Sequence, residues 1–130
     1  ELLVQGDQPK TILLKRFAAM PQGILVATWQ MIDGWDFGDA GVAGAVLDRL
    51  PLMASSDVIS SPLEKTSFID HAVPRAQAAM KRIGAMLVRR EWHDAQLIVA
   101  DTRLLTEAYA RTIVSVLSPT VLSPTGQERK

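Results

Sequence analysis

The residues best suited to chemistry in this sequence are two carboxylates and two glycines in one short loop, Asp33, Gly34, Asp36 and Gly38. The loop follows the apolar run 24–27, which is typical of a strand buried on both faces of a parallel sheet. It therefore leaves the carboxyl end of a central strand, where open α/β sheets bind ligands and place moving parts. The two carboxylates could equally be solvated loop residues that cap a turn.

Motifs that hold a nucleotide or a metal ion are missing from this sequence. It has no glycine-rich phosphate loop with a lysine and a serine or threonine, and no acidic box for magnesium after an apolar strand. His71 and His93 have no partner at metal-ligand spacing, and the motifs supply no set of nucleophile, base and orienting group. We therefore expect the chain alone to have no catalytic residue, no metal site and no cofactor.

The composition is that of an α/β domain without a strong electrostatic signature. Lysine plus arginine and aspartate plus glutamate number 14 each, so no overall basic field indicates nucleic-acid binding. The lack of cysteine excludes disulfides and thiolate chemistry and fits a reducing cytosol, which predicts a cytoplasmic protein. No apolar run approaches the roughly 20 residues of a membrane span, so we expect no membrane partner.

Strand-like and helix-like segments alternate along the chain. The expected strands are 2–5, 24–28, 44–50 and 96–100. The expected helices are 9–20, 74–90 and 104–117. This alternation predicts a mainly parallel sheet with right-handed crossovers, in an α/β three-layer sandwich. The expected domain is 1–119, and the polar residues 120–130 are expected to be a loose tail or linker.

The loop with the two carboxylates also resembles a known motif. Beyond the strand, its central residues read Ile32-Asp33-Gly34-Trp35-Asp36. In the DinG and XPD-like DNA helicases of superfamily 2, this motif consists of tryptophan, glutamate, glycine, an apolar residue and aspartate, in that order. Ile32 and Asp33 stand at the first two places, while Gly34 and Asp36 are unchanged.

Other segments resemble the same helicase family in the same order along the chain. The segment 3–6 resembles the strand and turn that open the family's second motor domain, and 49–52 resembles a later strand end. The segment 72–88 resembles the last helicase motif, while 101–103 and Tyr109 resemble the strand and helix that close the domain. The resemblance thus covers nearly the whole chain, and its specificity lies in the ordered set.

The resemblance implies a RecA-like, P-loop NTPase-type fold and the role of second motor domain in an ATP-dependent DNA helicase, of a kind that acts in DNA repair. ATP and magnesium would be bound mainly by an N-terminal RecA-like domain of the same protein, outside these residues. Single-stranded DNA would be held by loops after the strand ends. Asp33, Gly34 and Asp36 would form the loop that couples nucleotide to DNA.

The last helicase motif departs from the family pattern. Lys81 stands at the family's glutamine and Gly84 at its glycine, and both are candidates for the nucleotide interface. The two arginine places hold Ala85 and Val88. Arginine suits these places because its planar fork can neutralise charge that develops during phosphoryl transfer. Their loss places the ATP hydrolysis of the longer protein in question.

Arg89 and Arg90 are further candidates for the same interface, with two interpretations open. One residue on a helix is a rotation of about 100 degrees, so Arg89 does not simply replace position 88. The segment 84–101 is one residue longer than is usual in the family, which would permit a local shift that brings an arginine to the nucleotide. The alternative is a charged helix end that interacts favourably with the helix dipole.

Two functions follow from the sequence. The first is a motor domain that couples ATP hydrolysis on the N-terminal domain to translocation along single-stranded DNA. The alternative is a degenerate, non-catalytic helicase-like domain that serves as a nucleic-acid or protein docking module. An intact phosphate-binding loop in the N-terminal part of the longer protein would favour the helicase, and its absence would favour the docking module.

Overall fold

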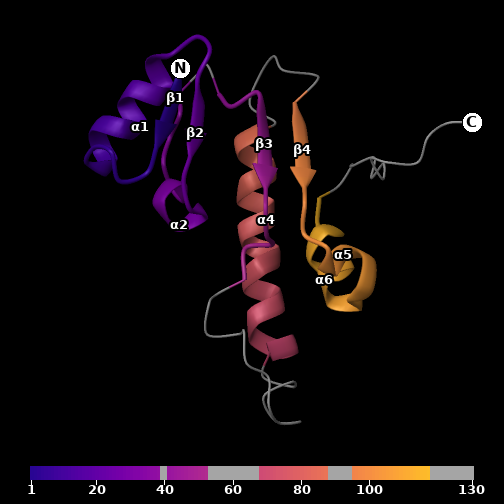
Figure 1. Cartoon of the computed structure of the whole chain (residues 1–130). Coiled ribbons are helices and arrows are strands. Elements are labelled where there is room, and N and C mark those ends of the chain that lie inside the picture. Colours follow the sequence, from indigo (N-terminus) through magenta and orange to yellow (C-terminus); the bar gives the residue numbers. More distant parts are fainter. Residues whose placement is uncertain (39–40, 53–67, 88–94, 118–130) are drawn as a thin grey trace, which may run out of the picture.

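Strands and helices alternate in the computed structural model, which describes residues 1–38, 41–52, 68–87 and 95–117 (Figure 1). The strands are β1 (Leu2–Val4), β2 (Ile24–Val26), β3 (Gly44–Leu47) and β4 (Gln96–Val99). The helices are α1 (Lys10–Ala19), α2 (Trp29–Ile32), the π-helical turn η2 (Phe68–Ala72), α4 (Val73–Leu87), α5 (Arg103–Thr106) and α6 (Ala108–Val114). The fold is α/β. No helix in this described part is long and apolar enough to cross a membrane.

The strands form two parallel pairs. β1 pairs with β2, with Leu2 opposite Ile24, and β3 pairs with β4, with Gly44 opposite Gln96. Among the described residues, the two pairs make separate two-stranded sheets. Parallel pairing is therefore confirmed, while the expected three-layer sandwich around one sheet is not confirmed by the described strands.

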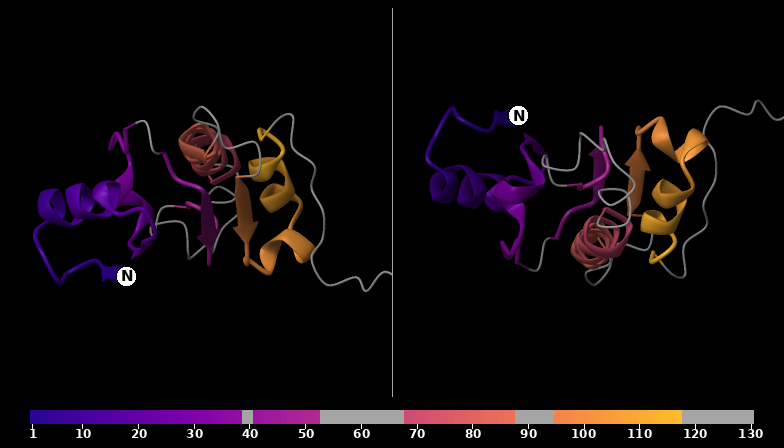
Figure 2. Two further views of the ribbon diagram at one scale, coloured as in Figure 1. Left: turned by 90° about the horizontal axis from the view of Figure 1, so that it is seen from above. Right: turned by 90° about the horizontal axis from the view of Figure 1, so that it is seen from below.

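The apolar side chains gather in two clusters that meet at α4. The larger cluster includes Met80, Ile83 and Ile113, and joins α4 and α6 to β3 and β4. The smaller one centres on Leu13 and Leu14 of α1 and packs against β1, β2 and α2. Figure 2 shows α1 beside the first pair of strands, and α4 and α6 beside the second. Met86 and Val42 contact both clusters and so connect the two halves.

Each strand pair buries one face and exposes the other. In β2 the side chains of Ile24 and Val26 are 64% and 53% exposed, while Leu25 packs against the smaller cluster. β3 and β4 show the same alternation, with Val46 and Ile98 exposed. The expectation of a strand buried on both faces is therefore wrong for β2 in this chain, because the described helices cover only one of its faces.

A buried carboxylate ties the ends of β3 and β4 together. Asp101 follows β4 and is 7% exposed. It accepts the Leu50 backbone N–H at 2.8 Å, the Arg103 backbone N–H at 3.0 Å, and a side-on pair of bonds from the Arg103 guanidinium. The guanidinium bonds and the backbone donors outweigh burial and lower the pKa of Asp101 to about 2. Asp101 in turn raises the pKa of Arg103.

The single helix expected at 104–117 is two helices in the structure. Glu107 adopts an extended conformation, with φ −111° and ψ 125°, and separates α5 from α6. After this break, α6 buries Ala110, Ile113 and Val114 against the larger cluster. The side-chain amide of Gln77 also donates to the Thr112 carbonyl at 3.0 Å, which ties α4 to α6.

Candidate functional site

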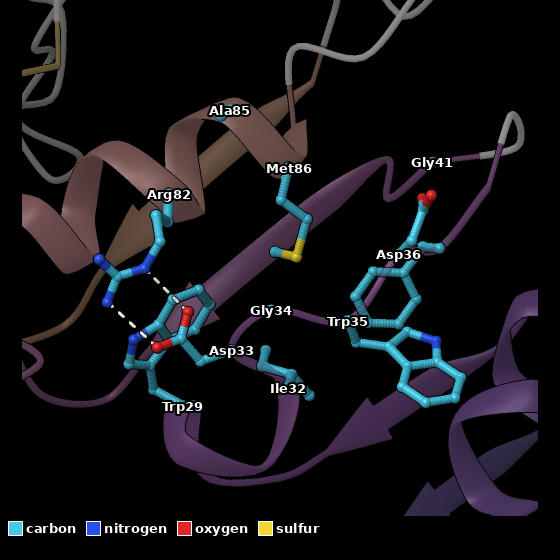
Figure 3. A pocket seen from close by; sticks show the side chains of 11 residues that line it. Trp29, Ile32, Asp33, Gly34, Trp35, Asp36, Gly41, Arg82, Ala85 and Met86 are labelled. Atoms are coloured by element: carbon cyan, nitrogen blue, oxygen red, sulfur yellow. Dashed lines mark hydrogen bonds and ion pairs between the residues drawn. The ribbon is translucent and has the colours of Figure 1, made fainter. Parts of the chain in front are cut away.

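A surface pocket of about 240 Å³ lies where α2 and the loop after it face α4 (Figure 3). Its lining residues are Trp29, Ile32, Asp33, Gly34, Trp35, Asp36, Phe37, Gly41, Arg82, Ala85 and Met86. The pocket thus brings together the two segments that the sequence singled out, namely the carboxylate loop and the helix of the last helicase motif. Residues 33–38, for which the resemblance implies a coupling role, are called the coupling loop from here on.

A bidentate ion pair in the pocket joins Asp33 to Arg82 of α4. Arg82 Nε donates to Asp33 Oδ1 at 2.8 Å, and Arg82 Nη2 donates to Asp33 Oδ2 at 3.1 Å. The guanidinium therefore binds the carboxylate side-on through two parallel hydrogen bonds, which fix the orientation of the carboxylate as well as its position. The same guanidinium lies over Trp29, with 6.0 Å between its central carbon and the ring centroid.

Partial exposure limits how much this ion pair stabilises the fold. The side chains of Arg82 and Asp33 are 51% and 34% exposed. Exposed ion pairs contribute only about 0–1 kcal/mol to folding, because water screens them and two long side chains lose freedom. The pair is therefore better suited to setting the position of the coupling loop than to holding the domain together.

The other two predicted residues of the coupling loop shape its turn. Gly34 has φ +76°, a left-handed conformation that favours glycine, and a Cβ added there would meet no atom within 4 Å. Asp36 is exposed, and its Oδ1 accepts the Gly38 backbone N–H at 2.9 Å. This contact within the loop is the turn-capping role that the sequence left open. Figure 3 shows the Asp36 carboxylate pointing away from Arg82.

The predicted residues of α4 do not converge on one point. Lys81 is exposed on α4 and is not among the residues that line the pocket. Gly84 faces Leu117, whose Cδ2 would lie 3.0 Å from an added Cβ, so glycine here permits close packing. Ala85, at the first place where the resemblance implies an arginine, lines the pocket. Val88, Arg89 and Arg90 lie outside the described residues.

A second, more polar hollow of about 490 Å³ lies at the carboxyl ends of β1 and β2. Its lining residues are Gln5, Gly6, Gln8, Lys10, Thr28, Gln30 and Met31. Gln5 Oε1 accepts both the backbone N–H of Thr28 at 2.8 Å and its hydroxyl at 3.1 Å. This contact holds the two strand ends together, and the exposed Lys10 lines the same hollow.

Sequence reasoning missed Arg82 and Gln5 as site residues. Arg82 lies near the last motif in the sequence, but its partner Asp33 is 49 residues away, and only the packing of α4 against α2 brings them together. Gln5 lies 23 residues from Thr28. A signal was available for Gln5, because polar residues that directly follow neighbouring parallel strands meet at one edge of the sheet.

In the described ranges, no group of histidine, aspartate and glutamate side chains could hold a metal ion.

The sequence matches a protein family described as "Helicase C-terminal domain" over residues 1–120. The chain belongs to this helicase C-terminal domain family, and its resemblance to DinG and XPD-like helicases is confirmed. No solved structure gives a significant match.

Named relatives point to the same family. The chain is 26% identical over 125 residues to "ATP-dependent DNA helicase YoaA" of Escherichia coli K12, covering 91% of this chain and 20% of the relative. It is 26% identical over 123 residues to the YoaA helicase of Haemophilus influenzae, covering 89% and 19%. It is 23% identical over 134 residues to "ATP-dependent DNA helicase DinG" of Photobacterium profundum, covering 92% and 19%. The chain thus spans about a fifth of the length of these relatives.

Proposed function

We propose that this chain is the second RecA-like motor domain of a DinG-like DNA helicase, which couples ATP hydrolysis on an N-terminal motor domain to movement along single-stranded DNA. The observation that carries this proposal is the helicase family match over residues 1–120, within which Asp33, Gly34 and Asp36 stand at the places of a helicase motif. The longer protein that would contain both motor domains is called the parent below.

The coupling loop is the proposed link between nucleotide and DNA. In the chain it comes after β2 and the short helix α2. The bidentate contact between Asp33 and Arg82 connects it to α4. A movement of α4 that follows closure of the motor domains on ATP would therefore be passed to the loop through this contact. Arg82 acts here as a positioning residue, because its fork holds the Asp33 carboxylate in one orientation.

The polar hollow beside β1 and β2 is the proposed contact with the DNA backbone. Lys10 supplies a positive charge at its rim, and Thr28 and Gln5 supply polar groups at the strand ends. Phosphate contacts of this kind position a nucleic acid without reading its sequence. They also make binding sensitive to salt, since each neutralised phosphate releases counterions.

ATP and magnesium are assigned to the N-terminal motor domain of the parent. In the described part of this chain, the pocket is lined by Ala85 at the place where the resemblance implies an arginine. Lys81 and Gly84 on α4, together with Arg89 and Arg90 beyond it, are the remaining candidates for contact with the bound nucleotide. Of these, only an arginine could supply the planar fork that stabilises phosphoryl transfer.

The alternative function is a non-catalytic docking module for nucleic acid or protein. Ala85 favours it, because the side chain that lines the pocket at this place carries no charge. The parent's N-terminal sequence separates the two functions. A phosphate-binding loop with its lysine and serine or threonine would support the motor, whereas its loss would support the docking module.

Residues 1–130 by themselves are expected neither to hydrolyse ATP nor to bind it with micromolar affinity. An interface face alone provides no cradle of backbone N–H groups for the phosphates. Calorimetric titration of the purified chain with ATP and magnesium measures this directly. Saturable micromolar binding at a single site would overturn the assignment as a second motor domain.

A further inference from the structure

β2 has a backbone edge that no described strand pairs with. The Ile24 N–H donates to the Glu1 carbonyl at 2.9 Å, and the Val26 carbonyl accepts the Gln5 N–H at 2.9 Å. The backbone groups of Ile24 and Val26 therefore face β1. Because alternate residues of a strand direct their backbone groups to opposite edges, those of Leu25 and Ala27 face away from β1. We call Leu25 and Ala27 the inner edge of β2.

β3 has a matching edge on its side away from β4. The Ala43 carbonyl accepts the Gln96 N–H at 3.4 Å, and the Leu47 carbonyl accepts the Ala100 N–H at 2.8 Å. Residues 43, 45 and 47 of β3 therefore face β4. By the same alternation, the backbone groups of Gly44 and Val46 face away from it and form the inner edge of β3.

The two inner edges face each other within one molecule. In Figure 1 the strands lie in the order β1, β2, β3, β4, and β2 and β3 lie farther apart than the partners within either pair. Figure 2 shows the second pair, β3 and β4, side by side from above and from below as well. No ladder joins β2 to β3 among the described residues. Two-stranded parallel sheets with open edges are poorly stable by themselves, and parallel sheets are ordinarily continuous and buried.

We propose that an extended segment of the parent, outside residues 1–130, inserts between β2 and β3 as a parallel strand and joins the two pairs into one sheet. The relatives provide the length for such a segment, since this chain spans only about a fifth of them. A second copy of the chain is a poorer occupant, because both edges belong to the same molecule and enclose the strand from two sides. The proposal does not depend on whether the parent hydrolyses ATP.

The neighbouring side chains define the chemistry of the inserted strand. Beside β2, the side chains of the inserted strand would meet the exposed Ile24 and Val26 on one face of the sheet. On the other face they would meet the packed Leu25. On β3 it would meet Val46 on one face and Ala45 and Leu47 on the other. Both faces of the inserted strand therefore require aliphatic side chains. The segment should be about four residues long, like its neighbours, rich in β-branched residues and free of charge.

Amide hydrogen exchange at single-residue resolution tests this proposal, because each strand pair contains its own control. In residues 1–130, the amides of Leu25, Ala27 and Val46 should exchange on the order of a hundredfold faster than those of Ile24 and Ala100, which donate to neighbouring strands. In the parent, all five amides should exchange at similarly slow rates.

Two results would overturn the proposal. Fast exchange at Leu25, Ala27 and Val46 in the parent would show that no strand covers the inner edges. This measurement on the parent decides the question even if residues 1–130 do not fold alone. Slow exchange of the same amides in residues 1–130 would show that β2 and β3 pair directly or that another segment of this chain lies between them.

Discussion

Replacing Asp33 by arginine in the parent is expected to lower its DNA-stimulated ATP hydrolysis severalfold or more, because two guanidinium groups would then face each other across the pocket. Arg82→Asp should have the same effect, since it places two carboxylates at that point. The exchange of both residues, Asp33→Arg with Arg82→Asp, should recover a substantial part of the activity by restoring an ion pair. ATPase assays of the three variants with single-stranded DNA measure this.

Stability measurements separate a coupling role from a structural one. The pair is partly exposed, so each single change should alter the free energy of unfolding by less than about 1 kcal/mol. Arg75→Asp is the matched control, because Arg75 is an exposed arginine on the same helix that does not line the pocket. A double variant that is no more active than the single ones, in proteins that fold normally, would contradict the positioning role of Arg82.

Removing the Asp101 carboxylate is expected to have the largest effect on stability. Asp101→Ala should destabilise the domain by about 3 kcal/mol, because it leaves Arg103 and the Leu50 N–H without their partner at a buried point. Asp48→Ala, which changes an exposed carboxylate just after β3, should cost no more than about 0.5 kcal/mol. Urea denaturation of both variants provides the comparison, and equal costs would contradict the proposed role of Asp101.

The Asp101 carboxylate also makes the free energy of unfolding depend on pH. The pKa of Asp101 is about 2 in the folded protein, against an ordinary value of 3.8, so folding favours its ionised form. Its contribution, about 2 kcal/mol, is fully present above pH 4 and is lost as the pH falls from about 4 to about 2. Asp101→Asn should lose this part of the pH dependence. An unchanged acid profile in that variant would rule out the ion pair as its source.

The regular elements of the fold were largely predictable from the sequence. The four strands and the long helix α4 lie within or close to the expected ranges, because apolar runs bounded by turn residues and a long helical periodicity are strong local signals. The helix α2 was not expected, since a four-residue helix is too short to show periodicity. The break at Glu107 was also missed, and the exposed face of β2 depends on which helices cover it.

The candidate site was predictable in part. The coupling loop was identified from its residue types and its place after a strand, and Gly34 and Asp36 do shape a turn there. Arg82 could not be assigned, because its contact with Asp33 arises only when α4 packs beside α2. The roles of Arg89 and Arg90 stay predictions, because both residues lie outside the described part of the chain.

ATP hydrolysis by the parent, measured with and without single-stranded DNA, is the most direct test of the proposed motor function. A motor whose second domain couples nucleotide to DNA should hydrolyse ATP slowly alone and severalfold faster when single-stranded DNA is added. Absence of hydrolysis under both conditions, in a parent that still binds DNA or a protein partner, would contradict the motor function and leave the docking module as the role of this domain.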